Sequence, residues 1–243
     1  MIPPVFWPIL LGVLGAVFGS FIATVAIRWP AGESALQGRS RCDGCGAELG
    51  AGDLVPVLSF LRLRGRCRRC GGRIARFHLG VEVLALAIGV VAGIVAPGAV
   101  GVAGAVFGWL LLTLGAIDLR AFWLPNPLVA ALALTGLASG AVGIAPPLDV
   151  RLIGGAAGFG ALWLVAALYR RARGRMGLGG GDPKLFGAIG LWLGWRALPG
   201  VLLIACVIGL CIAIARGMRG GERLPLGTLL AAAGFAWWAA AAL

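Results

Sequence analysis

The amino-acid sequence predicts an all-α, polytopic membrane protein with one small polar domain, and three observations support this prediction. Hydrophobic residues make up 60% of the chain and charged residues only 12%, whereas soluble domains carry about 25% charged residues. The apolar residues gather into stretches close to the roughly 20 residues that a bilayer-spanning helix needs. A polar, arginine-rich segment, residues 28–78, interrupts this pattern.

We expect about eight transmembrane helices. The apolar stretches are 5–27, 79–96, 98–117, 127–144, 152–169, 184–198, 200–215 and 225–243. The first lacks a small-residue cleavage site and exceeds the core of a signal peptide, so we interpret it as a retained anchor. The sixth is short and ends at Trp195-Arg196. The predicted organisation is a first transmembrane helix (1–27), a polar domain (28–78) and a larger membrane domain (79–243).

The positions of the basic residues predict the orientation in the membrane. Of the 21 lysine and arginine residues, 19 fall in loops on one predicted side, and only Arg151 and Arg196 fall on the other. Because basic residues in short loops stay in the cytoplasm, we expect the polar domain to be cytoplasmic and both termini to lie outside. This topology explains the net charge of +12, so we expect a lipid bilayer, and no nucleic acid, as partner.

Four cysteines of the polar domain, Cys42, Cys45, Cys67 and Cys70, form two C-x2-C pairs with 21 residues between them. This spacing suits a tetrahedral zinc site, and the glycine after the second cysteine of each pair permits a tight turn. A domain of this size commonly needs a metal or disulfides, and a reducing cytoplasm disfavours disulfides. Two pairs in knuckle contexts also disfavour a redox C-x-x-C. We expect structural Zn²⁺, because four cysteines leave no open coordination position.

Three of the nine acidic residues, Glu82, Asp118 and Asp182, lie at or near the predicted cytoplasmic ends of spans. Ionisable groups at membrane depth are costly and indicate function. Asp118 and Asp182 reach the same predicted face at similar depth. Two close carboxylates can share one proton, so that one activates a water as base and the other acts as acid. The pair therefore predicts an aspartic protease. The alternative is that Asp118 pairs with Arg120 and Asp182 caps a helix.

The residues around Asp182 suit substrate binding. We expect Gly179 and Gly181 to adopt backbone conformations that are closed to other residues, and to leave room for an extended peptide. Pro183 fits the first turn of a helix, where its missing N–H does no harm. We expect Lys184 to bind peptide carbonyls or to bias the charge of the aspartate pair, with a loop anchor as the alternative.

Four stretches carry a family resemblance that runs from end to end of the chain. They are "GSFIATVAIRWP", "SRCDGCGAELGAGDLVPVLSFLRLRGRCRRCGGRIARFHLGVEVL", "AIDLRAFWLPN" and "MGLGGGDPKLFGAIGLWLGW". In order, spacing and membrane context the chain resembles the bifunctional prepilin peptidases, which are type IV leader peptidases and N-methyltransferases of the bacterial inner membrane. The resemblance implies that Asp118 and Asp182 form the protease dyad and that the four cysteines belong to a zinc-bearing cytoplasmic domain.

The resemblance also implies a reaction. Members of this family cleave a short basic leader from type IV prepilins or type II secretion pseudopilins at the cytoplasmic face, and methylate the new N-terminus with S-adenosylmethionine. Methylation follows from the resemblance alone, because no glycine-rich loop after a strand indicates a pocket for that cofactor. The alternatives are a peptidase without methyltransferase activity, a non-catalytic zinc-bearing scaffold, and a presenilin-type intramembrane protease.

The chain departs from the family pattern at three places. Asn126 stands where many members have Asp, Pro183 where an apolar or aromatic residue is commoner, and "RFHLGVE" where a Tyr-Pro pair usually precedes the Glu. The last departure leaves the role of Glu82 in methylation open. We interpret His78 as an interfacial polar residue, with a fifth metal ligand or a base as alternatives.

Overall fold

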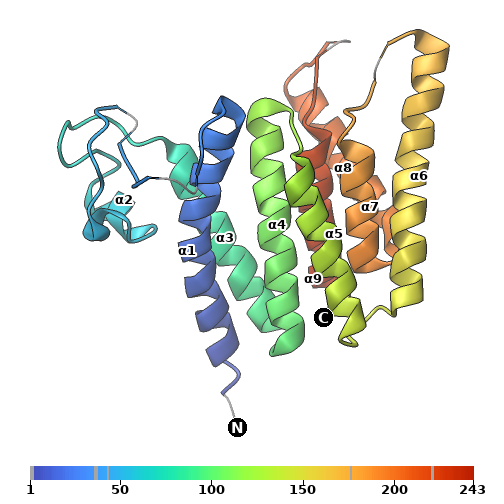
Figure 1. Ribbon diagram of the computed structural model, residues 1–243, viewed down its shortest axis with the longest axis horizontal. Helices are drawn as coiled ribbons and strands as arrows, with labels where there is room; N and C mark the ends of the chain where they lie inside the picture. Colours follow the sequence, from blue (N-terminus) through green and yellow to red (C-terminus); the bar gives the residue numbers. More distant parts are fainter. Residues whose placement is uncertain (1–2, 36–37, 43, 176, 220–221) are drawn as a thin grey trace. The chain divides into compact units, whose positions relative to one another are not determined.

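The computed structural model describes residues 3–35, 38–42, 44–175, 177–219 and 222–243, and this part of the chain is mainly helical (Figure 1). Within these residues there is no β-strand, only two isolated bridges, Arg41↔Glu48 and Arg66↔Arg73. The predicted all-α fold class is confirmed. The chain divides into two compact units, Met1–Ala105 (unit 1) and Val106–Leu243 (unit 2).

Eight helices of the described residues correspond in position to the eight predicted spans. They are α1 (Phe6–Arg28), α3 (Arg76–Val95), α4 (Ala99–Ala121), α5 (Asn126–Ala141), α6 (Leu148–Arg173), α7 (Asp182–Leu193), α8 (Leu198–Ala215) and α9 (Leu226–Ala241). Between α1 and α3, the described residues form the five-residue helix α2 (Leu58–Arg62) and two 3-10 turns, Trp29–Ala31 and Ala51–Asp53. By length and composition, α1, α3, α4, α6 and α8 are each sufficient to cross a membrane, whereas α5 and α9 are shorter apolar helices.

Helix α7 is three residues shorter than the predicted sixth span, 184–198, and ends at Leu193. It has 12 residues, which corresponds to about 18 Å at 1.5 Å per residue and is less than the roughly 30 Å of a bilayer core. Gly194 ends it with φ +76°, and the 3-10 turn Trp195–Ala197 then leads into α8. The left-handed glycine interrupts the apolar stretch, so sequence hydropathy alone overestimated the length of this helix.

In unit 1, α1 and α3 pack closely along their length through glycines. A Cβ placed on Gly15 would lie 2.2 Å from the carbonyl oxygen of Ala85, and one on Gly89 would lie 2.0 Å from that of Leu11. No side chain fits at either position. Small residues in membrane helices allow this backbone approach where no hydrophobic force draws helices together.

Helix α7 is the core of unit 2. Nine of its 12 residues are buried, and it contacts α5, α6, α8 and α9. The backbones of α6 and α7 meet at Gly154 and Gly190, where a Cβ on either glycine would lie within 2.4 Å of the carbonyl oxygen of the other; the two helices lie side by side in Figure 1. On the other flank, Trp192 donates a hydrogen bond to the Leu132 carbonyl of α5 at 2.7 Å. These contacts fix the helix that begins with Asp182.

Arg151 of α6 is 1% exposed and ties several elements of unit 2 together. All five of its N–H donors reach backbone carbonyl oxygens at 2.8–3.1 Å. The acceptors are Gly136 of α5, Leu191 of α7, and Ile144, Ala145 and Pro146 of the α5–α6 loop. Because buried carbonyl groups need a hydrogen-bond donor, the guanidinium group satisfies them and holds the end of α7 that is remote from Asp182.

We expect Arg151→Met to destabilise the protein by roughly 3 kcal/mol, because carbonyl groups that share one charged donor lose it together. Thermal unfolding of the purified protein in detergent, followed by tryptophan fluorescence, measures this effect. The matched control is Arg196→Met, since Arg196 is exposed. An unchanged unfolding temperature for Arg151→Met would contradict the assigned role.

Candidate active site and metal site

Asp118 lies near the C-terminal end of α4 and is 5% exposed. Its Oδ2 accepts hydrogen bonds from the backbone N–H of Thr228 at 2.8 Å and from the Thr228 hydroxyl at 3.3 Å. The same hydroxyl lies 2.8 Å from the Gly115 carbonyl oxygen, so the two acceptors share its single proton. Thr228 is in the first turn of α9, where backbone N–H groups lack partners within the helix. Asp118 therefore accepts a hydrogen bond from an N–H group in the first turn of α9. The partial positive charge at this helix end stabilises the ionised carboxylate.

Asp182 is the first residue of α7 and is 6% exposed. Its Oδ2 accepts a hydrogen bond from the backbone N–H of Gly179 at 2.9 Å, while its own N–H donates to the Gly179 carbonyl at 3.2 Å. Both interactions lie on the loop side of the residue, before the helix begins. Pro183 follows within the first turn, as the sequence indicated. The carboxylate is thus held by the preceding loop at the positive end of the α7 dipole.

Leu124 lies close to residues next to both aspartates. This residue is 8% exposed and lies in the turn between α4 and α5. A Cβ on Gly181, directly before Asp182, would lie 2.7 Å from Cβ of Leu124. A Cβ on Gly227 would lie 2.9 Å from Oδ2 of Asp118 and 3.1 Å from Cδ1 of Leu124. Asp118 also acts electrostatically on Asp182. The ends of three helices, α4, α7 and α9, therefore meet around one leucine and two carboxylates.

The expected reason for a glycine at position 181 is wrong. Gly181 has φ −84° and ψ −28°, an ordinary helical conformation that any residue adopts, and Gly179 has no left-handed φ either. Space is the actual constraint at position 181, because Leu124 fills the place that a side chain would take. At Gly179 a Cβ would lie 3.0 Å from Oδ2 of Asp182. The two glycines therefore allow the loop to approach the aspartate and the leucine.

Lys184 donates a hydrogen bond to Oδ1 of Asn126 at 2.9 Å. This contact joins the first turn of α7 to the first residue of α5. Asn126 is one of the departures from the family pattern, and its neutral amide oxygen accepts the ammonium. The sequence did not pair these two residues, which are 58 positions apart.

A groove of about 330 Å³ in unit 2 is lined by residues that precede and follow Asp182 in the sequence, although not by Asp182 itself. Phe159 and Trp163 of α6 supply aromatic walls, and Gly177–Gly180 and Pro183 supply the side next to the aspartate. Arg170 and Lys184 also line it. The groove is mostly apolar, and its glycine-rich side leaves the backbone accessible.

Sequence reasoning missed Thr228. Its sequence context, "PLGT" after a basic loop, indicates only the start of a helix. Thr228 donates a hydrogen bond to Asp118, which is 110 positions away in the sequence. No local sequence pattern connects the two residues. A polar residue in the first turn of an otherwise apolar helix was the available signal.

Each cysteine pair of the polar segment forms the same turn. The N–H of the first cysteine donates to the carbonyl five residues later, and the N–H of a glycine donates back to the carbonyl of that cysteine. These bonds join Cys42 to Ala47 and Gly46 to Cys42 in the first turn, and Cys67 to Gly72 and Gly71 to Cys67 in the second, at 2.8–2.9 Å. Gly46 and Gly71 have φ of +68° and +69°. The predicted role of the glycine after each pair is confirmed.

The four sulfur atoms of Cys42, Cys45, Cys67 and Cys70 all lie within 4.8 Å of one another. A tetrahedral zinc ion with bonds of about 2.3 Å places its sulfurs about 3.8 Å apart, so the cluster fits such an ion. All four cysteines are free of disulfides. We refer to residues 40–74, which contain both turns, as the four-cysteine module.

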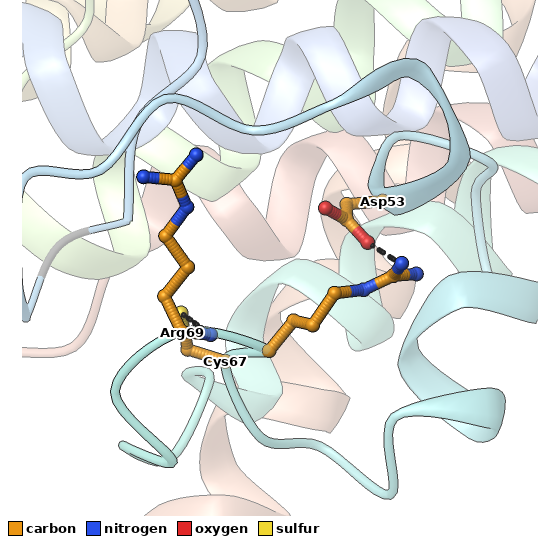
Figure 2. A network of polar contacts seen from close by, with 4 residues as sticks. Asp53, Cys67 and Arg69 are labelled. Atoms are coloured by element: carbon orange, nitrogen blue, oxygen red, sulfur yellow. Dashed lines mark hydrogen bonds and ion pairs between the residues drawn. The ribbon is translucent and has the colours of Figure 1, made fainter.

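Backbone N–H groups favour the thiolate form at Cys67. Hydrogen bonds from the backbone of Cys70 and of Arg69 lower the pKa of the Cys67 thiol to about 6. Figure 2 shows the second of these, from the Arg69 N–H to the sulfur at 3.4 Å, together with the carboxylate of Asp53 nearby. That carboxylate makes an ion pair with Arg68 at 2.9 Å. A preformed thiolate suits metal binding, because metals bind the deprotonated form.

Glu82, the third acidic residue singled out in the sequence, is 8% exposed in α3. Its Oε2 accepts a hydrogen bond from the backbone N–H of Val57 at 2.7 Å. Val57 has φ +62°, a conformation that a β-branched residue rarely adopts. Glu82 therefore ties α3 to a strained point of the four-cysteine module.

Known proteins resemble the chain over most of its length. Residues 13–95 match the bacterial peptidase A24 N-terminal domain, and residues 105–214 match the type IV leader peptidase family. Three relatives carry the name prepilin leader peptidase/N-methyltransferase. The Burkholderia pseudomallei (strain K96243) protein is 38% identical over 92% of this chain and 82% of the relative. The Aeromonas salmonicida (strain A449) protein is 38% identical over 81% and 69%, and the Klebsiella pneumoniae protein 37% identical over 83% and 92%.

No solved structure matches the chain. The first family match lies in unit 1 and the second almost entirely in unit 2, and the Burkholderia pseudomallei relative is 38% identical over 92% of the chain. The chain therefore belongs to the type IV leader peptidase family.

Proposed function

We propose that the protein cleaves the basic leader from type IV prepilins or pseudopilins with Asp118 and Asp182, and methylates the new N-terminus. The observation that carries the proteolytic part is the meeting of two buried carboxylates around Leu124 at the ends of three helices. The names of the relatives, prepilin leader peptidase/N-methyltransferase, support the substrate and the second activity.

The hydrogen bonds suggest different roles for the two acids. Asp118 accepts bonds from both the N–H and the hydroxyl of Thr228, and donors of this kind favour the charged form of a carboxylate. Asp182 accepts one from Gly179. We therefore assign Asp118 as the base that takes a proton from the attacking water, and Asp182 as the acid that donates one to the peptide carbonyl oxygen. As the peptide bond breaks, Asp118 passes the proton that it took from water to the leaving amine, and Asp182 regains its proton from the hydroxyl group of the tetrahedral intermediate.

The groove beside Asp182 suits the apolar part of the substrate. Phe159 and Trp163 offer aromatic surface, while the glycine-rich side admits an extended backbone next to the acid. A prepilin cleavage point lies between a polar leader and an apolar segment. The proposed arrangement places the apolar segment in the groove and the scissile bond at the aspartates.

The predicted topology adds sidedness to this proposal. The basic loops favour a bacterial inner-membrane protein whose polar domain and active site both face the cytoplasm. The proposed order of domains is a first transmembrane helix (1–27), the polar domain (28–78) and the peptidase domain (79–243). We further propose that the module holds structural Zn²⁺ through its four cysteines. S-adenosylmethionine, when bound, supplies the methyl group to the new amine, which releases a proton while the electron pair of the broken bond stays on sulfur.

We expect Asp118→Asn and Asp182→Asn each to lower the rate of leader cleavage by at least about a hundredfold, which is the range that one positioned acid or base contributes. Cleavage of a prepilin by the purified protein measures this, and membrane accumulation of each variant checks its folding. The control is Asp149→Asn, because Asp149 is exposed at the start of α6. Wild-type cleavage by either variant would refute the pair.

We expect Thr228→Val to slow cleavage about tenfold, since it removes one hydrogen bond to a charged group and keeps the backbone N–H. Thr228→Ser retains the hydroxyl and should restore the rate. Comparison of kcat for the three proteins tests this. Equal rates for the Val and Ser variants would show that the hydroxyl does not act on Asp118.

We expect the purified protein to contain about one zinc per chain, as a four-cysteine site binds one ion, and Cys67→Ser to lose it. Elemental analysis after dialysis measures the metal content. Cys206→Ser is the matched control, because Cys206 is an exposed residue of α8 outside the cluster. Zinc retention by Cys67→Ser, or its absence from the wild type, would contradict the assignment.

A further inference from the structure

The segment directly before Asp182, residues 177–181, consists of four glycines and one leucine. Glycine loses more conformational freedom on folding than any other residue, so this segment keeps one conformation only where neighbouring groups restrain it. The segment supplies the Gly179 N–H that binds the Asp182 carboxylate, and most of it lines the groove. Whatever restrains residues 177–181 therefore acts on the proposed active site.

Two of the restraints are the hydrogen bond at Gly179 and the close approach of Gly181 to Leu124. A third is at the start of the segment, where the ring of Tyr169 lies against Gly177. A Cβ on Gly177 would lie 2.6 Å from both Cδ1 and Cε1 of the ring and 3.1 Å from Cγ. The ring thus occupies the place that a side chain at position 177 would take.

Tyr169 is the only tyrosine of the chain, and it lies half-buried in the last two turns of α6. Gly174 ends this helix with φ +66°, and its N–H donates to the Arg170 carbonyl at 2.9 Å. A left-handed glycine at this position ends a helix and redirects the chain, and the chain then passes the ring at Gly177. Tyr169 does not line the groove, so its ring supports the segment without filling the space offered to a substrate.

The contact is made by ring carbons and not by the hydroxyl group. An aromatic ring combines a large apolar area with few rotatable bonds, which makes it a rigid support for a flexible backbone. Only two residues separate the supported position from the carboxylate contact, because Gly179 both donates to Asp182 and accepts from its N–H at 3.2 Å. Movement at Gly177 would therefore reach the acid through a very short piece of chain.

We propose that Tyr169 is a positioning residue of the peptidase: its ring fixes residues 177–181, and this segment fixes the carboxylate of Asp182. The inference rests on the proposed function and adds to it a residue that acts through the segment rather than on the reacting groups. It also gives the end of α6 a part in catalysis, although neither aspartate belongs to that helix.

We expect Tyr169→Ala to lower kcat for leader cleavage by about tenfold or more, because a misplacement of about 1 Å at a reacting group can cost about a hundredfold. KM should change by less than about threefold, since the aromatic walls Phe159 and Trp163 remain and lost transition-state stabilisation appears in kcat. Tyr169→Phe keeps the ring and should retain the wild-type kcat. The control is Leu168→Ala, because Leu168 is 58% exposed on the same helix.

A double variant tests whether Tyr169 and Gly177 act through their contact. Gly177→Ala places a methyl group where the ring lies and should also lower kcat. Because changes to one shared contact do not add, Tyr169→Ala combined with Gly177→Ala should be about as active as the slower single variant. Gly160→Ala is the matched control for the glycine, since a Cβ at Gly160 of α6 meets no atom within 4 Å.

Hydrogen exchange followed by mass spectrometry measures the restraint independently of catalysis. In Tyr169→Ala the amides of residues 177–181 should exchange faster, because local opening exposes them, while α7 exchanges as in the wild type. Four outcomes would each overturn the proposal: unchanged exchange of the segment, a wild-type kcat for Tyr169→Ala, a kcat for Tyr169→Phe as low as that of Tyr169→Ala, or multiplied losses in the double variant. Equally faster exchange throughout α7 would show a general loss of stability and also overturn it.

Failure of this inference is distinguishable from failure of the proposed function. If Asp182→Asn cleaves prepilin at the wild-type rate, the aspartate pair fails and the role of Tyr169 fails with it. If Asp182→Asn is inactive while Tyr169→Ala keeps the wild-type kcat, the peptidase assignment stands and only the positioning role fails.

Discussion

The structure of unit 2 depends on how two buried carboxylates are held where little water reaches them. Asp118 and Asp182 are each about 95% buried, and each lies at the N-terminal end of a helix, one belonging to α9 and the other to α7. Helix N-termini supply unpaired N–H groups and partial positive charge. Holding the carboxylates by backbone N–H groups requires that the helix ends converge. Leu124, Gly181 and Gly227 make that convergence sterically feasible.

The rest of unit 2 supports this convergence from a distance. Helix α7 is short, buried on nearly every side and fixed at its far end by the carbonyl contacts of Arg151 and by Trp192. Polar groups of the chain satisfy one another here, as a lipid environment requires. Unit 1 is stabilised in a different way, because its polar segment is too small to bury a large hydrophobic core. Two turns with the same hydrogen-bond pattern bring four sulfurs together, and α1 and α3 pack backbone against backbone.

Composition and motif spacing were sufficient for the fold class, the eight helical regions and the cysteine cluster, because each follows from local pattern. The spacing of the cysteines and the glycines after them determines the two turns almost completely. The length of α7 was overestimated, since hydropathy does not register the left-handed conformation of Gly194. The contacts of Asp118 with Thr228, and of Lys184 with Asn126, were not predictable from one sequence. Each joins residues far apart in the chain, so they depend on how helices pack rather than on any local propensity.

The contact between Asp118 and Thr228 also bears on what counts as the catalytic part of the chain. The segment that matches the type IV leader peptidase family ends at residue 214, while α9 begins only at Leu226. A protein trimmed to the matched segment would keep both aspartates yet leave Asp118 buried without its donors. Any transplant of this active site into another membrane scaffold must therefore carry the last helix as well, although the family match ends before it.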